Sequence, residues 1–419
     1  MTCELLKGLR MLDLTDDKGA ICGKIFADMG AEVIKVEPPP GCSTRRIAPF
    51  LDDQPGPDTS LYFLAYQAGK KSITLNLECA DGRRLLTELA RKSDFVVQSY
   101  PVGYLDSLDL GFDSLIKTNP RLIYTSIMPF GDSGPGKHYA AADITVWAAG
   151  GNMYLMGEEG RPPLQISAPQ AGLHAGAEAA AGSLIAHYPR QSSGQGQHVV
   201  VDMQACVVWT LMNAQAFPIL HGGSMKRSGV FSGALRLRRK MVFRCADGHI
   251  STLLTGGAAA ASLKAMVDWM AEKGFAADWM KRQKWSVWAP GVISPASDQE
   301  IEQVHDLEDR VQQFLLTMTK REIYAEGLKR RILLSPVNTV AEIADDEQLK
   351  ARGFFRPVRH DLGGGRTLTM PGPFAVLSAT PLAAPQPAPK LGQHNAEIYG
   401  GLLGLSASDL SRLRAIDAI

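Results

Sequence analysis

Hydrophobic and polar positions change their spacing repeatedly along the first third of the chain. Residues 9–15 form an apolar run with strand character, residues 21–29 suit a helix, and residues 31–37 form a second strand-like run after Gly30. This order is typical of a β-α-β unit whose helix ends at a glycine. The alternation continues with expected strands at 72–77, 95–98 and 122–127 and expected helices at 81–92 and 112–117. It predicts an α/β fold with a parallel, doubly wound sheet.

The stretch from Gly160 to Cys206 has the clearest local order in the chain. A helix is expected from Pro169 to about His187, followed by a polar turn at 191–197 and a run at 198–203 with the character of a buried strand. Small residues on the expected helix let another backbone approach closely: Ala171, Gly172, Ala175, Gly176, Ala179, Ala180 and Gly182. We therefore expect this helix to be packed on several sides, at the centre of a site or an interface.

The character of the sequence changes beyond residue 220. Residues 221–239 are rich in glycine, serine and basic residues, which indicates a linker or crossing segment. Strand-like runs at 241–245 and 250–254 are followed by several amphipathic helices, which indicates a smaller α+β domain. Its tryptophans are expected in the core rather than around a cofactor: Trp269, Trp279, Trp285 and Trp288.

The last part of the chain returns to the style of the first. A strand-like run at 332–337 precedes an expected helix at 340–352, and residues 381–389 form a proline-dense linker. The patterns together predict four segments: a large domain at 1–220, a linker at 221–240, a small domain at 241–325, and a linker with a C-terminal return to the large domain at 326–419.

Composition excludes several classes of function. The 419 residues carry a formal charge of +1, with 45% hydrophobic and 21% charged residues, so nothing recruits nucleic acid or an anionic membrane. We expect a cytoplasmic protein without a signal peptide or membrane span, because no run of 18 apolar residues occurs. The six cysteines are scattered without metal-ligand spacing, which favours reduced thiols and no metal. The turn Asp16–Ala20 lacks GxGxxG, so a bound dinucleotide is not expected.

A series of ordered motifs resembles the family III coenzyme A transferases, the group of formyl-CoA transferase, carnitine CoA-transferase and α-methylacyl-CoA racemase. The matching segments are 9–37 (with LRMLDLT and GAEVIKVE), 72–77 (SITLNL), 81–82, 111–112, 119–123, 130–136, 194–203, 335–337, 352–355 and 391–394 (LGQH). Only residues 207–330 are poorly covered. The resemblance implies a large Rossmann-like domain built from both chain ends, an inserted small domain, and two subunits interlocked as rings. It also implies an active site between the large domain of one subunit and the small domain of the other.

The sequence departs from this family at the residue that carries the chemistry. Family transferases use an aspartate as a covalent nucleophile, four positions before the glycine of a Gly-Leu-His or Gly-Met-His pattern. In this chain Gly172-Leu173-His174 places Ala168 at that position. A methyl group cannot be acylated, so this chain cannot follow the family mechanism there. Two basic positions of the family are also changed, to Pro38 and Ser107, and each loss removes a charge-assisted contact worth roughly 1.5–3 kcal/mol.

Other residues could line a substrate or CoA site if the resemblance holds. Asp143 matches an acidic family position, but an acid that caps or orients neighbouring backbone is the simpler interpretation. His174 is more simply a core or interface histidine, and Lys18, in the loop where relatives cover the thioester, is more simply a solvated lysine. Gly256 and Gly257 resemble in position a small-domain glycine loop, although a plain hairpin exit fits equally well. The candidate lining residues are Lys18, Tyr100, Asp143, Gln170, His174, Gly256 and Gly257.

Two function classes follow from the resemblance. In the first, the chain is a non-catalytic subunit of a heteromeric family III enzyme, paired with a homologous subunit that supplies the aspartate in an interlocked heterodimer or heterotetramer. The run at 167–178 resembles the branch that moves CoA from succinyl-CoA to benzylsuccinate in anaerobic toluene breakdown, and other aryl or alkyl succinates fit as well. No cofactor is expected to be bound covalently, since the coenzyme A thioester is the substrate.

In the second class the chain is a self-sufficient acyl-CoA transferase, racemase or lyase. It would then use a different acid or base, namely Asp143, Glu178 or His174. A scaffold with no acyl-CoA role is a third, weaker alternative.

Overall fold

The computed structural model describes residues 5–221, 225–232, 237–291, 295–361 and 365–419. The chain divides into two compact units. Unit 1 contains residues 1–153, 165–213 and 347–419, so both chain ends contribute to it. Unit 2 contains residues 154–164 and 214–346. The four segments predicted from the sequence stay a prediction.

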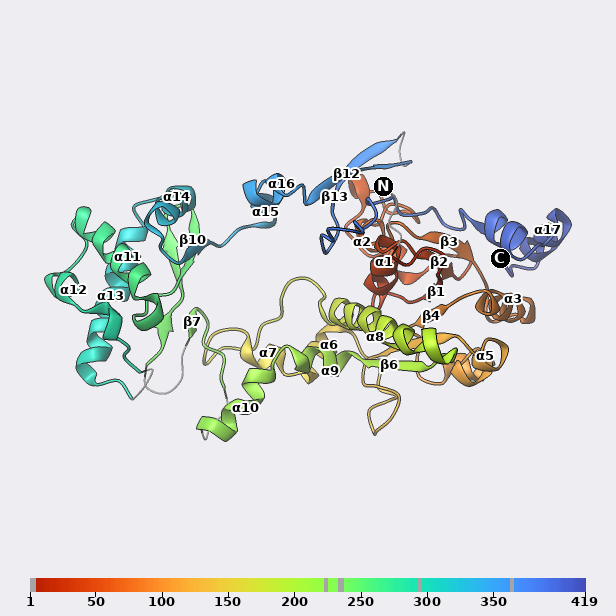
Figure 1. The fold of residues 1–419 in the computed structure, drawn as a ribbon, viewed down its shortest axis with the longest axis horizontal. Helices are drawn as coiled ribbons and strands as arrows, with labels where there is room; N and C mark the ends of the chain where they lie inside the picture. The colour runs from red at the N-terminus through yellow and green to blue at the C-terminus, as the bar shows by residue number, and fades with distance from the viewer. Residues whose placement is uncertain (1–4, 222–224, 233–236, 292–294, 362–364) are drawn as a thin grey trace. The chain divides into compact units, whose positions relative to one another are not determined.

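A six-stranded sheet forms the centre of unit 1 (Figure 1). Its strands are β1 (Arg10–Leu14), β2 (Glu32–Glu37), β3 (Lys71–Thr74), β4 (Phe95–Gln98), β5 (Ile123–Met128) and β6 (His198–Asp202). They lie in the order β3-β2-β1-β4-β5-β6, and every neighbouring pair is parallel. The predicted parallel, doubly wound α/β fold is confirmed. The chain reverses its direction of winding between β1 and β4, which makes that point the topological switch of the sheet.

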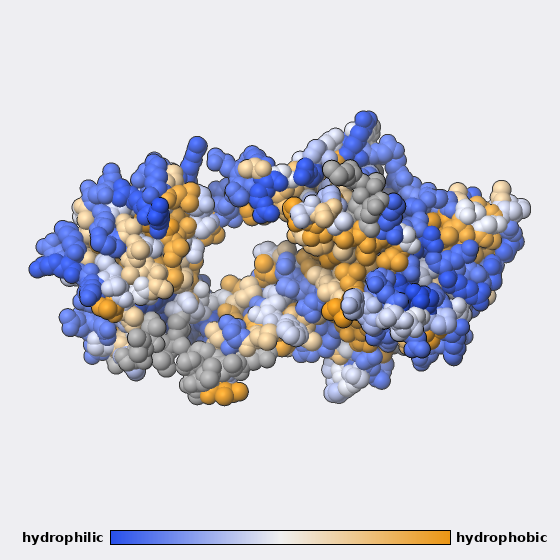
Figure 2. Space-filling model, viewed as in Figure 1, coloured by the Kyte–Doolittle hydropathy of each residue, from blue (hydrophilic) through white to orange (hydrophobic). Residues whose placement is uncertain are grey.

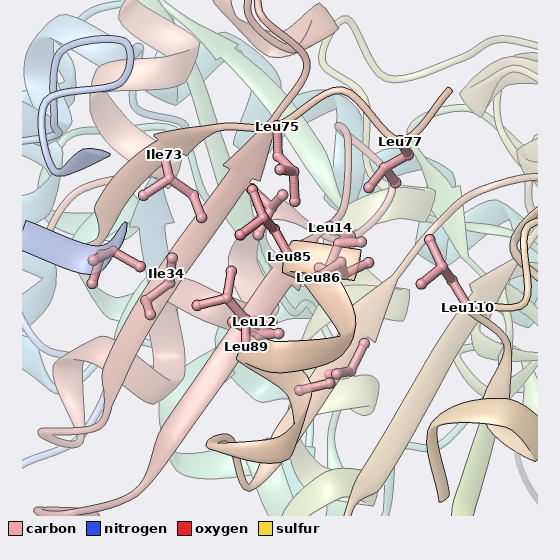
Figure 3. Close-up of a cluster of buried hydrophobic side chains, with 14 of the residues drawn as sticks. Leu12, Leu14, Ile34, Ile73, Leu75, Leu77, Leu85, Leu86, Leu89 and Leu110 are labelled. Atoms are coloured by element: carbon pink, nitrogen blue, oxygen red, sulfur yellow. The ribbon is translucent and has the colours of Figure 1, made fainter. Parts of the chain in front are cut away.

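One face of the sheet is covered by helices from both chain ends. Leucine and isoleucine side chains of β1, β2 and β3 meet Leu85, Leu86 and Leu89 of α3 (Ala80–Arg91) in one apolar cluster (Figure 3). Tyr399 of the π-helix η5 (Ala396–Leu402) and Leu413 of α17 (Ala407–Ala415) belong to the same cluster. The C-terminal segment is therefore part of the core of unit 1.

The other face is covered by α1 (Ala20–Asp28) and α8 (Ala171–Ser193), which pack against each other. The approach is close because α8 presents glycines to it: a Cβ atom on Gly172 would lie 2.7 Å from the carbonyl oxygen of Asp17. A Cβ atom on Gly176 would lie 2.6 Å from the Ile21 side chain. The small residues of α8 thus do what their pattern predicts, since they admit a neighbouring backbone.

The predicted bounds of α8 are wrong at both ends. The helix begins at Ala171 rather than Pro169, and it continues past Pro189 to Ser193, where the left-handed Gly194 ends it. A long-range contact stabilises the extra turns: the buried Arg190 donates to the carbonyl oxygens of Asp94 (3.0 Å) and Arg121 (3.1 Å). Local sequence does not reveal a contact with distant residues. The proline and the polar residues after it therefore indicated that the helix ends earlier, in a turn.

Strand β6 is not the buried strand that its apolar run predicted. It is the last strand of the sheet, and only Val201 of its five residues is buried while Val200 is 38% exposed. An edge strand pairs on one side only, which a run of valines does not reveal. Other large apolar side chains are exposed on α8, on α9 (Met203–Trp209) and at the start of α10 (Met212–His221): Ile185, Tyr188, Trp209 and Met212. Ile219, in the part of α10 that belongs to unit 2, is also exposed. Figure 2 shows hydrophobic surface at the end of α10.

Unit 2 is built on the antiparallel sheet β11-β10-β9, with β9 at Val242–Cys245 and β10 at Gly248–Thr252. Its main helices are α11 (Ala260–Glu272), α12 (Asp278–Arg282), α13 (Asp298–Leu315) and α14 (Lys320–Arg330). Trp269, Trp285 and Trp288 are buried in its core and Trp279 packs against it, as their pattern predicts. The run at 332–337 does not return to unit 1, since its strand β11 (Leu334–Pro336) pairs with β10.

The segments expected to be linkers contain more structure than predicted. The segment 326–419 includes the hairpin of β12 (Phe355–His360) and β13 (Arg366–Pro371), and residues 221–240 include the short pair β7 (Phe231–Ser232) and β8 (Arg239–Lys240). The expected helix at 340–352 is two helices, α15 (Val340–Ala344) and α16 (Glu347–Ala351). Parts of these expectations, at 222–224, 233–236 and 362–364, lie outside the described residues.

The remaining elements are short. They are η1 (Ser43–Arg46), η2 (Leu51–Asp53), α2 (Leu61–Tyr66), α4 (Tyr104–Ser107), α5 (Phe112–Thr118), α6 (Asp143–Ala149), α7 (Asn152–Leu155), η3 (Gly257–Ala259) and η4 (Trp285–Val287). Among the helices that the structure describes, none is both long and apolar enough to cross a bilayer.

Candidate functional site

A cleft of about 540 Å³ lies in unit 1 at the carboxyl ends of the parallel strands. Its walls are the loop after β1, the start of the segment after β2, residues 99–102 after β4, and residues 137–141 beyond β5. Open parallel sheets bind ligands in the crevice where strand order reverses, and β1 and β4 are the two strands on either side of that point. The cleft is therefore the position at which this fold offers a ligand site.

The loop after β1 is tied to the loop after β4 across this cleft. The Asp16 backbone N–H donates to Ser99 Oγ (2.8 Å), and the Ser99 hydroxyl donates to Asp16 Oδ1 (2.7 Å). Asp16 Oδ1 also accepts from the Lys18 backbone N–H (3.0 Å), and Asp16 Oδ2 pairs with the Lys18 ammonium group. Lys18, expected as a lining residue, does line the cleft, but as the partner of a carboxylate that the sequence reasoning did not single out.

Beneath this loop, Asp13 of β1 lies fully buried between two ammonium groups. Lys70 Nζ is 2.6 Å from Asp13 Oδ2, and Lys35 Nζ is 3.4 Å from Asp13 Oδ1. Burial by itself would raise the pKa of Asp13, but the charges of Lys35 and Lys70 outweigh it and lower the pKa to about 2. Lys35 also donates to the carbonyl oxygen of Thr15, which fixes the end of β1 where the cleft begins.

The stability contributed by the Asp13 charge should disappear in acid. The folded pKa of about 2 lies below the unfolded value of about 3.9, so the charged form contributes about 2 kcal/mol above pH 4, and this is lost as the pH falls towards 2. Urea unfolding of wild type and Asp13→Asn should therefore show a gap in unfolding free energy that shrinks by about 2 kcal/mol between pH 5 and pH 2. The exposed Asp109→Asn serves as control. A gap that stays constant with pH would contradict this assignment.

After β2, a buried arginine fixes the excursion that forms another wall. Arg45 is 1% exposed and donates two hydrogen bonds to the Glu37 carboxylate, from Nε to Oε2 at 2.6 Å and from Nη2 to Oε1 at 2.8 Å. Its Nη1 binds Asp58 Oδ1 at 2.7 Å, and its guanidinium lies 3.7 Å from the centre of the Phe63 ring. Although burial alone would raise the pKa of Glu37, Arg45 lowers it. The hydrogen bonds of Arg45 to Glu37 and Asp58 therefore fix the segment 38–57, which contains little regular secondary structure, next to the end of β2.

Tyr100 lines the cleft from the loop after β4. Its predicted contact with a substrate or CoA stays a prediction. Its ring stacks on Tyr104 at 4.9 Å between centroids, and burial raises the pKa of its hydroxyl. The Tyr100 backbone N–H donates to Gln98 Oε1 (2.7 Å), and Gln98 in turn donates to Ser126 Oγ (2.9 Å). A chain of polar contacts through the sheet thus sets the position of this tyrosine.

A second cavity of about 330 Å³ adjoins the position of Ala168. Pro169, just before α8, and Gly172 and Leu173 of α8 line it. Lys18 of the first loop and Asp143 of α6 line it as well. Its walls are otherwise mainly apolar, from Ile47, Ala48, Tyr62, Pro129, Ala141, Ala142, Val146 and Met203. Ala168 is exposed and lies three residues before α8 begins. That it stands at the position of the family nucleophile stays a prediction.

Asp143 acts on the backbone at the start of α8. Its Oδ1 accepts from the backbone N–H groups of Gln170 (2.9 Å) and Ala171 (2.7 Å), two of the donors that a helix start leaves without an internal partner. The Gln165 amide lies 3.5 Å from Oδ2. The structure therefore favours the capping interpretation of Asp143. Gln170, expected as a lining residue, lines neither cavity and meets Asp143 only through its backbone N–H.

The other two alternative catalytic residues do not line either cavity. The His174 ring stacks on Trp147 with 5.9 Å between centroids. Glu178 is exposed on α8 and interacts with the thiol of Cys206, whose pKa is raised first by burial and then by that carboxylate. Asp17, which the sequence reasoning passed over, does line the second cavity, and burial followed by the charge of Asp16 raises its pKa. A position directly after a strand was the signal that could have found Asp16 and Asp17.

Gly256 and Gly257 lie in unit 2, between β10 and α11. A Cβ atom on Gly256 would lie 2.2 Å from the carbonyl oxygen of Trp285 and 2.1 Å from that of Trp288, so only glycine fits there. Their predicted role as a loop over the site stays a prediction. Among the described residues, no cluster of histidine, cysteine, aspartate or glutamate is placed to hold a metal ion.

The family model of CoA-transferase family III matches residues 6–395. The chain belongs to this family. It is 31% identical to the succinyl-CoA:(R)-benzylsuccinate CoA-transferase subunit BbsE of Thauera aromatica, over 98% of this chain and 97% of that relative. It is also 31% identical to the formyl-CoA:oxalate CoA-transferase of Streptomyces avermitilis, over 98% of each chain. The resemblance seen in the sequence motifs is confirmed.

A solved structure shares the fold of this chain. A CAIB/BAIF family protein from Brucella suis superposes with a TM-score of 0.79 at 27% identity, covering 96% of this chain and 100% of that one. The parallel sheet observed here is therefore consistent with membership of family III. The candidate cleft lies in unit 1, which contains this sheet.

Proposed function

We propose that this chain is a non-catalytic subunit of a heteromeric family III CoA-transferase, which moves CoA from succinyl-CoA to a carboxylic acid such as benzylsuccinate. A homologous chain supplies the aspartate that becomes acylated, and the coenzyme A thioester is the substrate. The similarity to a relative named as a subunit of such an enzyme supports both the partner and the acid.

The observation that carries the proposal is the absence of a free carboxylate at the start of α8. Ala168 replaces the nucleophile, and the nearby Asp143 carboxylate is committed to the N–H groups of Gln170 and Ala171. Asp17 lines the same cavity, and burial, followed by the charge of Asp16, raises its pKa. Acylation at Asp143 would have to break the cap of α8.

The exposed apolar side chains along α8 and α9 support a partner chain. Ile185 and Tyr188, one helical turn apart on α8, are 73% and 80% exposed, and Trp209 of α9 is 63% exposed. An interface with a homologous subunit would bury them, as is usual for permanent complexes.

Acyl-enzyme trapping tests the proposal directly. The purified chain, incubated with succinyl-CoA and quenched with hydroxylamine or borohydride, should keep its unmodified mass, because no acyl anhydride forms on it. An aspartate-bearing family III transferase treated in the same way is the positive control. A trapped adduct on any carboxylate of this chain would replace the subunit proposal with the self-sufficient enzyme.

A further inference from the structure

The cleft between the loops after β1 and β4 carries a carboxylate where its geometry favours a bound anion. The loop Thr15–Gly19 leads into the N-terminus of α1, and the carboxyl ends of parallel strands next to a helix start form a common anion site. In this chain Asp16 occupies that loop, and its carboxylate accepts the Lys18 backbone N–H at 3.0 Å. The loop's own carboxylate is thus already hydrogen-bonded to this N–H group before any ligand binds.

The same carboxylate neutralises the nearest cation. The Lys18 ammonium group pairs with Asp16 Oδ2, and both side chains line the cleft, 25% and 31% exposed. Among the cleft-lining residues, all of which the structure describes, the other cation is Lys137, and no arginine is present. Asp16 therefore removes about half of the positive charge that the cleft could offer to an anion.

Asp16 is also prevented from turning away. Ser99 is 4% exposed at the end of β4, beside β1 in the sheet, and it exchanges two hydrogen bonds with Asp16, at 2.7 Å and 2.8 Å. A carboxylate held by a buried hydroxyl, a backbone N–H and an ammonium group is fixed in place before any ligand arrives.

We infer that Asp16 is a specificity-determining residue that competes with the anionic groups of an acyl-CoA for Lys18 and for the loop before α1. This inference rests on the proposed function, because that function makes the CoA thioester the ligand of the family cleft. The contacts of Asp16 make binding of CoA to this chain weak. In the assembled enzyme the thioester is then directed to the aspartate-bearing chain, and it is not sequestered on a subunit that cannot react with it.

Calorimetric titration of the purified full-length chain with CoA tests the inference. Asp16→Asn removes the negative charge, keeps an acceptor for Ser99 and releases Lys18, so CoA should bind about tenfold tighter or more than to wild type. Asp109→Asn makes the same change of net charge at an exposed position outside the cleft and should leave the dissociation constant within about twofold. The melting temperature of each variant confirms that it is folded.

Two further variants test the role of Lys18 and guard against a poorly folded Asp16→Asn protein. Lys18→Met alone should change CoA binding by less than about twofold, since Asp16 already neutralises the Lys18 charge. Lys18→Met added to Asp16→Asn should remove most of the increase in CoA affinity that Asp16→Asn produces. Asp16→Ser should reproduce the gain with a smaller hydrogen-bonding group. Unchanged binding in both folded Asp16 variants, or a large loss in Lys18→Met alone, would overturn the inference.

Failure of this inference and failure of the proposed function give different results. If the Asp16 variants bind CoA no better but the chain still forms no acyl adduct, only the competition by Asp16 is wrong. If the Asp16 variants bind tighter and wild type is nevertheless acylated by succinyl-CoA, the inference stands and the non-catalytic role is wrong.

Discussion

CoA transfer by a reconstituted pair, formed by this chain and an aspartate-bearing homologue, should fall by about 10⁴-fold or more when the homologue's aspartate is replaced by alanine. Removal of a covalent nucleophile commonly costs this much, because no other group in the site can take the acyl group. Steady-state transfer from succinyl-CoA to benzylsuccinate, followed by chromatography of the two thioesters, measures the loss.

The matched substitutions in this chain should have small effects on the same assay. Asp143→Asn keeps an oxygen that can accept the N–H groups of Gln170 and Ala171, so turnover should stay within about fivefold of the wild-type pair. Ala168→Gly should be nearly neutral. If the pair retains turnover without the homologue's aspartate and loses it with Asp143→Asn or Asp17→Asn, the catalytic carboxylate belongs to this chain.

Arg45→Ala should lower the free energy of unfolding by about 3–5 kcal/mol. The substitution leaves the buried Glu37 carboxylate without its two guanidinium bonds, and an uncompensated buried charge is costly. It also removes the contact with Asp58 and the packing on Phe63. Urea unfolding of the purified chain at pH 7, followed by circular dichroism, measures the change.

Arg91→Ala is the matched control, because it removes another arginine–glutamate pair in unit 1. Arg91 and Glu88 are 49% and 37% exposed in that pair, and an exposed pair contributes about 0–1 kcal/mol. The two substitutions should therefore differ by several kcal/mol. If they cost the same, solvent must reach the Arg45–Glu37 pair, and the firm base assigned to the cleft wall would be wrong.

Most of the architecture of unit 1 could be predicted because its signals are local. Each strand and helix of a β-α-β unit has its own apolar spacing, and short connections leave few ways to join them. The exceptions are informative: α8 continues past Pro189 because Arg190 finds carbonyl oxygens at Asp94 and Arg121, which are 96 and 69 residues away. Local spacing contains no record of such contacts.

The residues of the candidate site also fall into two groups, those that local sequence could identify and those that it could not. Ala168, Lys18 and Tyr100 could be named from motifs, because each occupies a fixed place relative to a strand or to the Gly-Leu-His run. Asp16 could not be assigned its role, since its partner Ser99 lies 83 residues further along the chain. The commitment of Asp143 to α8 likewise joins residues 27 and 28 positions apart.

The sequence by itself determined that the chain is a parallel α/β protein with the motifs of family III, and it predicted that Ala168 stands at the nucleophile position. All of this follows from single residues and local spacing. Only the tertiary structure decided that Asp143 caps a helix, that Asp16 neutralises Lys18 in the cleft, and that β6 is an exposed edge. The charge and hydrogen-bonding capacity of a side chain are known from its identity, but their use depends on which groups the fold brings within about 3 Å of it.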